Sequence, residues 1–120
     1  FTTVKIHDSI DDVVKLMIQT HQSELVVVDA KQKFYGKIDS VSLLNKTGTL
    51  SSAGVVDTSC IVIDHEASLQ EAMEVASNFV GEIIPIVQKN TNKVVGVITE
   101  GAIFQAYLSK QDQTVEMEKR

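Results

Sequence analysis

A threonine near the C-terminal end of the sequence stands where an anion could bind. Residues 94–98 read VVGVI, Thr99 comes next, and helical spacing begins at once after it. A hydroxyl at a helix start lies beside free backbone N–H groups and the positive end of the helix dipole, which together favour a phosphate group. One helical turn later, however, Ala102 offers no polar side-chain atom. The pattern therefore predicts a binding turn that lacks one of its two polar groups.

A second stretch earlier in the chain repeats this pattern with different chemistry. Residues 35–44 read YGKIDSVSLL, in which Gly36 aligns with Gly96 and Ile38 with Ile98 of the later stretch. Asp39 stands where the later stretch has its threonine, and Ser42 follows one turn on. A carboxylate repels a phosphate unless a metal ion lies between them, so this turn favours an uncharged or cationic ligand.

The two turns end two copies of one longer pattern. The segment VKIHDSIDDVVKLM from Val4 aligns with IDHEASLQEAMEVA from Ile63. Each copy has an extended segment, then a helix with apolar residues at helical spacing, then two strands and a second helix. The first helix of each copy starts with an S-x-x-acid capping box: Ser9 with Asp12, and Ser68 with Glu71.

The order β-α-β-β-α, written twice, predicts an α+β fold. One copy alone would leave a sheet face exposed, so we expect the two sheets to pack together around a pseudo-twofold axis. The predicted strands are 25–28 and 34–38, then 83–87 and 94–98, and the predicted second helices are 40–46 and 100–109. The predicted divisions are a first repeat at 1–46, a linker at 47–59, a second repeat at 60–110 and a charged tail at 111–120.

The composition is that of an ordinary globular domain. The 120 residues carry a net charge of −5 without a basic cluster, which argues against nucleic acid as a partner. No apolar run is long enough to span a membrane, and no signal peptide is visible. The single cysteine, Cys60, fits a reducing compartment. We expect the chain to be a piece of a longer protein whose other parts include membrane spans.

The repeat resembles the CBS domain, and a tandem pair of such domains is called a Bateman module. The resemblance covers roughly residues 1–110 and rests on the strand IPIV at 84–87 and on VVGVITEGAIF at 94–104. It implies a regulatory module that senses ATP, ADP, AMP or another adenosyl ligand such as S-adenosylmethionine. The signal would pass to an attached enzyme, channel or transporter. The ending GVITEGAIFQAYL is similar to the cytoplasmic tails of CLC-type chloride channels and antiporters, while a parent like IMP dehydrogenase or a kinase stays open.

The resemblance also implies two clefts, each built from both repeats. In the family, the threonine hydroxyl of a Thr-x-x-Asp turn contacts the phosphate, and the aspartate carboxylate of that turn contacts the ribose. The first cleft is expected to comprise Thr2, Thr3, Val4, Glu24, Leu25 and Val26 with Ile98, Thr99 and Ala102. The second is expected to comprise Ile61, Val62, Ile83, Ile84 and Pro85 with Ile38, Asp39 and Ser42. Since Ala102 cannot bind the ribose, nucleotide affinity should fall about 10- to 150-fold, yet the first cleft is the favoured one.

Two alternatives stand beside the sensor hypothesis. Thr99 and Asp39 can serve as helix caps alone. The pair can also be a structural module with empty clefts that forms a homodimer through the helices at 10–20 and 69–80. No metal-ligand spacing, phosphate loop or nucleophile with a supporting base is present, so the sequence predicts no catalytic activity.

Overall fold

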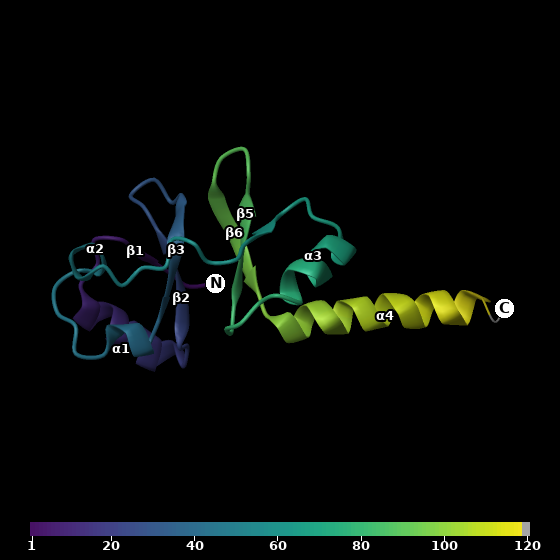
Figure 1. The fold of residues 1–120 in the computed structure, drawn as a ribbon, viewed down its shortest axis with the longest axis horizontal. Helices are drawn as coiled ribbons and strands as arrows, with labels where there is room; N and C mark the ends of the chain where they lie inside the picture. The colour runs from purple at the N-terminus through teal and green to yellow at the C-terminus, as the bar shows by residue number, and fades with distance from the viewer. Residues whose placement is uncertain (119–120) are drawn as a thin grey trace.

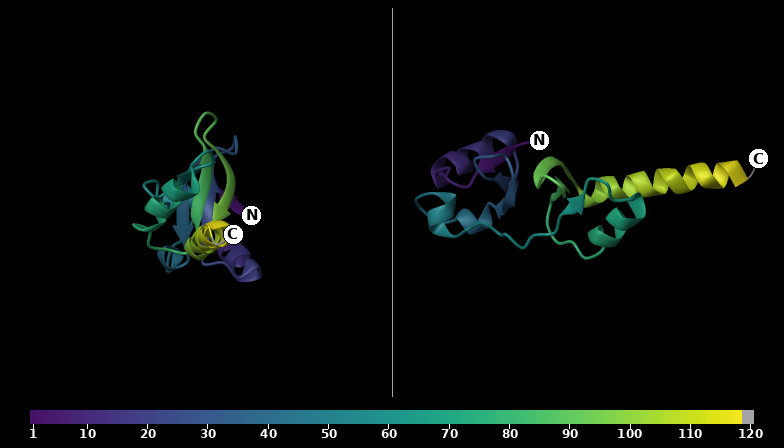
Figure 2. Two further views of the ribbon diagram at one scale, coloured as in Figure 1. Left: turned by 90° about the vertical axis from the view of Figure 1, so that its right-hand side faces the viewer. Right: turned by 90° about the horizontal axis from the view of Figure 1, so that it is seen from above.

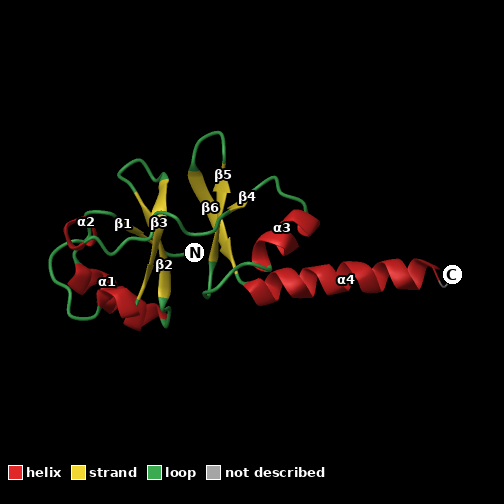
Figure 3. Cartoon of the chain, viewed as in Figure 1, coloured by secondary structure: helices red, strands yellow, loops and turns green. Residues whose placement is uncertain are grey.

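The chain forms two three-stranded sheets that face each other, with the helices on the outer sides (Figures 1 and 3). The computed structural model describes residues 1–118. The first repeat contains β1 (Thr3–Lys5), α1 (Ile10–Thr20), β2 (Glu24–Val28), β3 (Phe34–Asp39), a 3-10 turn (Val41–Leu43) and α2 (Leu50–Ala53). The second repeat contains β4 (Ile63–Asp64), α3 (Leu69–Ala76), β5 (Ile84–Gln88), β6 (Lys93–Ile98) and α4 (Glu100–Glu118). The predicted α+β class is confirmed.

The two sheets have the same topology and the same irregularity. In each, the first strand pairs in parallel with the second, and the second pairs antiparallel with the third. The register shifts between Val27 and Val28 in one sheet and between Ile86 and Val87 in the other. These positions correspond in the aligned repeats, so the internal repetition of the sequence extends to the details of the backbone.

Serine caps begin the first helix of each repeat, as the sequence predicts. The Oγ of Ser9 accepts a hydrogen bond from the Asp12 amide at 3.1 Å, and Ser68 Oγ accepts one from Glu71 at the same distance. Each bond satisfies one of the amides that a helix start leaves without an intrahelical partner. The left-handed backbone of His21, at φ 55°, ends α1 and turns the chain toward β2.

Successive side chains of each strand point to opposite faces of the sheet. One face packs against the helices as the core of its repeat, and the other face packs against the other sheet. Leu25 and Val27 are fully buried in the first core, while Val26, between them in the strand, is equally buried but lies on the other face. Val26 stands opposite Lys37 on β3, whose side chain reaches the second repeat, so this face is the one turned toward the other sheet. The same alternation in β5 places Ile84 in the second core and Pro85 toward the first repeat.

The prediction of a helix over residues 40–46 is wrong. Only the 3-10 turn forms there, because Asn45 adopts a left-handed backbone at φ 61° and ends any helical continuation. The helix of this region comes later, as α2, within the segment predicted as a linker. Its Leu50 is fully buried in the first core, and the Leu50 amide donates to the Asp8 carbonyl oxygen at 3.0 Å.

The connection after α2 continues along the first repeat before it reaches the second. Asp57 exchanges two backbone hydrogen bonds with Lys37, at 2.9 and 3.0 Å, and so covers the outer edge of β3. Gly36 makes this crossing possible: a Cβ there would lie 2.5 Å from the Asp57 carbonyl oxygen and 2.7 Å from Val56 Cγ1. Much of the segment at 47–59 is therefore packed on the first repeat.

Helix α4 extends well past the predicted end at residue 109. It begins directly after β6, packs against α3, and then runs away from the rest of the molecule as far as Glu118 (Figure 2). The backbone of residues 111–118, placed in the predicted charged tail, is thus helical, while residues 119–120 lie outside the described residues. Within the described chain, no helix is both long and apolar enough to cross a membrane.

Candidate functional site

Thr99 caps α4. Its Oγ1 accepts a hydrogen bond from the Ala102 amide at 3.1 Å, and its carbonyl oxygen accepts one from the Ile103 amide at 3.2 Å. Because the hydroxyl acts here as an acceptor, its own hydrogen can still be donated to a further group. The side chain is exposed at the end of β6, beside the helix start. Capping and anion binding are therefore compatible at this residue.

Asp39 makes a similar bond just before the 3-10 turn. Its Oδ1 accepts a hydrogen bond from the Ser42 amide at 2.8 Å. The helix at 40–46 that it was expected to cap does not form, and Ser40 is the residue at the start of the turn. The two residues differ in the hydrogen-bonding capacity left after these bonds are made. The Thr99 hydroxyl can still donate its hydrogen, whereas the Asp39 carboxylate has only acceptor sites.

The edges of the sheets bring the first strand of each repeat beside the last strand of the other. A hollow of about 230 Å³ is lined by Phe1, Thr3 and Val28 together with Lys93 and Val94 at the start of β6. A second hollow, of about 360 Å³, places Val62 and Ile63 beside Phe34 at the start of β3. Both lie at the ends of these strands away from Thr99 and Asp39. The strands expected to border each cleft thus come together at these ends.

The predicted site residues fall into four groups in the structure. Val4, Leu25, Ile38 and Ile84 belong to the helix-facing cores, where Ile98 also packs. Val26 and Pro85 lie in the layer between the sheets, and Thr2, Thr3 and Val62 lie at the strand edges with at least partial exposure. Thr99, Ala102, Asp39 and Ser42 form the two turns. The strand residues with access to the space between the repeats are therefore those at the edges, and the buried core residues shape the strands from behind.

A charged cluster at the boundary between the repeats was not anticipated from the sequence. Glu24 Oε1 accepts a hydrogen bond from Lys37 Nζ at 2.9 Å and from the amides of Glu82 and Ile83 at 2.9 and 3.0 Å. The Lys37 ammonium also donates to the Ile83 carbonyl oxygen at 3.2 Å and lies 4.8 Å from the centre of the Phe79 ring. The side chains of the ion pair are only 12% and 11% exposed.

This environment keeps the Glu24 carboxylate charged. Burial acts to raise the pKa of Glu24, but the hydrogen bonds from the Ile83 amide and from Lys37 outweigh that effect. The net result is a pKa below the ordinary value of a glutamate. A sequence signal for the cluster does exist. Glu24 and Lys37 align with Ile83 and Val97 of the second repeat, so charge replaces apolar side chains on a face that packs against the other sheet.

Gln22 carries another polar group that sequence reasoning missed. Its Oε1 is buried and has no hydrogen-bond partner among the described residues. It lies in the short connection from α1 to β2, the segment that the family resemblance assigns to the ligand. A buried acceptor without a partner costs free energy, which a bound donor would recover.

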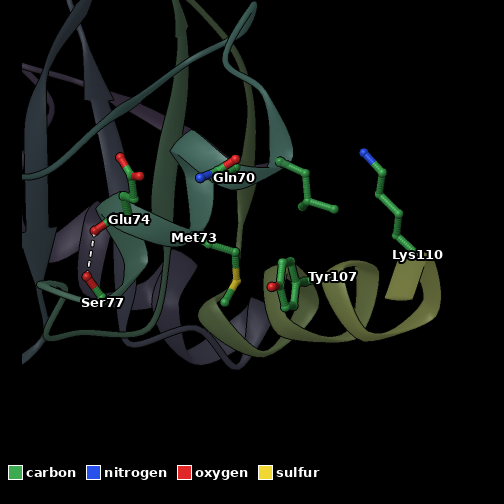
Figure 4. A pocket seen from close by; sticks show the side chains of 7 residues that line it. Gln70, Met73, Glu74, Ser77, Tyr107 and Lys110 are labelled. Atoms are coloured by element: carbon green, nitrogen blue, oxygen red, sulfur yellow. Dashed lines mark hydrogen bonds between the residues drawn. The ribbon is translucent and has the colours of Figure 1, made fainter. Parts of the chain in front are cut away.

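A larger hollow than the two at the strand ends lies on the outer helical side of the second repeat (Figure 4). It measures about 580 Å³, and its lining comes from α3 and α4. Met73 and Tyr107 face each other across it, and Ser77 Oγ donates to the Glu74 carbonyl oxygen at 2.7 Å at its rim. None of the predicted cleft residues lines this hollow, so it is distinct from the space between the repeats.

Comparisons with known proteins agree with the internal repeat. Residues 1–46 and 53–109 match the model of the CBS domain. No curated protein matches the chain in sequence. The structure of CBSX2 in complex with AMP has a TM-score of 0.76 and 20% identity, with 92% of this chain and 89% of that chain covered. CBSX2 is a CBS-pair protein from Arabidopsis thaliana.

Two further structures extend the comparison. Staphylococcus aureus OpuCA has a TM-score of 0.77 and 17% identity, covering 90% of this chain and 92% of that one. The cytosolic domain of the Mg2+ channel MgtE in complex with ATP has a TM-score of 0.75 and 12% identity, covering 88% and 44%. At these identities the likeness establishes the shared fold.

Proposed function

The chain belongs to the CBS domain family, and on that premise we propose that it is a regulatory module that binds an adenine nucleotide or a related adenosyl ligand in its first cleft. The observation that carries the proposal is the Thr99 turn. It combines a hydroxyl that retains its hydrogen with the amino end of α4, and such an arrangement suits a phosphate group. The bound AMP of CBSX2 and the bound ATP of MgtE support this choice of ligand class.

The rest of the proposed cleft supplies surfaces for the base and sugar. Thr2 and Thr3 offer hydroxyls on the β1 edge, and the fully buried Val26 supports that edge from the next strand, opposite Thr3. We also assign the orphaned acceptor of Gln22 to a ligand donor, for which the amino group of adenine is suited. Because Ala102 leaves the ribose without a carboxylate, the affinity should lie at the weak end, in keeping with a ligand at millimolar concentration.

A thermal unfolding panel with ATP, ADP, AMP and S-adenosylmethionine tests the proposal. A ligand at 100 times its dissociation constant should stabilise the folded chain by about 2.7 kcal/mol and raise the melting temperature. Absence of a shift with every ligand at several millimolar would contradict the sensor function.

Substitution at Thr99 tests the assignment of the cleft. Thr99→Ala should weaken the nucleotide found in the panel about 10- to 150-fold, because one hydrogen bond to a charged group is lost. Thr99→Ser is the matched control, since it keeps both the cap and the donor and should bind as the wild type does. Equal affinities for all three proteins would place the ligand in a different cleft.

The proposed effector is an attached membrane transport protein, with this chain on its cytoplasmic side. The choice of a transport protein is motivated by the shared fold with the cytosolic domain of the Mg2+ channel MgtE. The more specific expectation of a chloride channel or antiporter stays a prediction. It is checked by flux measurements on the full-length protein, in which Thr99→Ala should abolish the nucleotide response and leave basal transport intact.

A ligand-free dimerisation module is the second candidate. The hollow between α3 and α4 favours it, because that hollow opens on a helix predicted to join two copies. Sedimentation equilibrium distinguishes the two functions. A stable dimer that Met73→Glu disrupts, together with no response to any adenosyl ligand, would support the structural role alone.

A further inference from the structure

The segment between α3 and β5 forms a small receptor for an anion. The amides of Glu82 and Ile83 are consecutive and point at one oxygen atom, at 2.9 and 3.0 Å. The Lys37 ammonium approaches the same oxygen from β3 at 2.9 Å. Successive amides that converge on one point are a recurrent anion-binding arrangement, and an ammonium group adds a full positive charge.

The backbone of this segment is shaped for a close approach. Gly81 has a φ of 144°, a conformation that side chains disfavour. A Cβ at this position would lie 2.9 Å from Glu24 Oε2 and 2.9 Å from Phe79 Cζ. Glycine therefore leaves the space in which the carboxylate sits. Phe79 in turn lies beneath the Lys37 ammonium and holds it on the repeat boundary.

The occupant of the receptor comes from the other repeat. Glu24 lies 58 residues before Glu82 in the sequence. Its carboxylate nevertheless accepts hydrogen bonds from the amides of Glu82 and Ile83 and from the Lys37 ammonium. The second repeat offers no counterpart, because Ile83 stands in the place that corresponds to Glu24. Lys37 and the amides would attract an oxyanion of similar size, such as a phosphate group, if this carboxylate were absent.

We propose that Glu24 is a built-in anion that occupies an oxyanion-binding site at the boundary between the repeats, formed by Lys37 and the amides of Glu82 and Ile83. A phosphate group and the Glu24 carboxylate exclude each other there. Because the carboxylate is part of the same chain, its effective concentration at the receptor is high, and external phosphate competes poorly. This receptor is thus closed to external anions by a charge of the protein itself.

Removal of Glu24 should open the site. In Glu24→Ala, inorganic phosphate should shift the NMR signals of the Glu82 and Ile83 amides in a saturable way. Its affinity should exceed that of the wild type by about tenfold or more, in line with the loss of an intramolecular competitor. Glu24→Gln removes the charge but retains the shape of the side chain, and it should also bind phosphate more tightly than the wild type. If the alanine variant does not fold, the same titration is made with Glu24→Gln. No gain in either variant overturns the proposal.

Two control variants separate this site from a general change in charge. Glu66→Ala removes one negative charge from a side chain that is 77% exposed, and it should bind phosphate no better than the wild type. Adding Lys37→Met to Glu24→Ala should abolish the gain. A gain in Glu66→Ala equal to that in Glu24→Ala, or one that survives Lys37→Met, overturns the assignment of these residues.

Parallel titrations identify the chemical group that is recognised. Free phosphate and ATP should both shift the two amides in Glu24→Ala, whereas adenosine should not. A response to adenosine with none to phosphate contradicts an oxyanion site. These readouts concern the Glu82 and Ile83 amides in a Glu24 variant, so they stand or fall separately from nucleotide binding at Thr99.

Discussion

The two repeats share one backbone plan but meet at their common boundary with different chemistry. The first repeat presents a charged pair, Glu24 and Lys37, where the second presents Ile83 and Val97. A buried ion pair holds its partners in one geometry, and here it fixes the two repeats against each other. The comparison indicates a division of roles: the Glu24–Lys37 pair, with the hydrogen bonds between Phe34 and Asn92, links the repeats, and the Thr99 turn retains groups suited to a ligand.

The repeats also differ in what completes their helical layers. In the second repeat, α4 follows β6 directly and buries Ile103 in the core. In the first repeat, the short α2 provides Leu50, and the connection then crosses closely over Gly36. The connection between the repeats is therefore a structural part of the first one.

The largest expected effect belongs to Leu50. Leu50→Ala removes a fully buried side chain from the first core and should lower the free energy of unfolding by about 2–5 kcal/mol. Leu44→Ala is the control, because Leu44 is 66% exposed and should change stability by less than about 0.5 kcal/mol. Urea denaturation measures both. Equal small effects would mean that the connection is a free linker after all.

The two equivalent glycines provide a sharper comparison. Gly36→Ala should destabilise the chain by about 1–3 kcal/mol, because its Cβ meets the backbone of Asp57. At Gly96 the nearest atom to a new Cβ is Ile86 Cδ1, at 3.9 Å, so Gly96→Ala should be neutral or stabilising by about 0.4–1 kcal/mol. Thermal denaturation of the two variants would contradict the asymmetry if both lost the same stability.

The serine caps should instead contribute equally to the stability of the two repeats. Ser9→Ala and Ser68→Ala should each cost about 0.5–2 kcal/mol of stability, since both hydroxyls accept one helix-start amide at 3.1 Å. Matched denaturation curves check this expectation. A loss confined to one variant would show that the local equivalence of the two helices does not extend to energetics.

The smallest expected effect is the dependence of stability on pH that Glu24 supplies. Since folding lowers the pKa of Glu24, its contribution to stability is present above the ordinary pKa and is lost as the pH falls through the lowered one. The stability difference between wild type and Glu24→Gln should therefore shrink as the pH falls from about 7 to 3. A difference that stays constant over this range would contradict a charged Glu24.

The features that were predictable from sequence are those with a local pattern. The caps at Ser9 and Ser68 and the paired strands follow from spacing alone, and the register of Thr99 with Asp39 follows from the repeat. Helix α2 was not predictable, because four residues with one buried leucine show no helical period. The Glu24–Lys37 pair depends on how two distant segments meet, which neither segment encodes by itself.

The central claim, that only the Thr99 side of the wild-type module accepts a nucleotide, is most directly tested by an amide-resolved NMR titration with ATP. We predict one saturable set of shifts that includes Thr3, Val26 and Thr99, with a stoichiometry of one ATP per chain and no shift at the Glu82 and Ile83 amides. Saturable shifts at Glu82 and Ile83, or two ATP molecules per chain, would contradict the account.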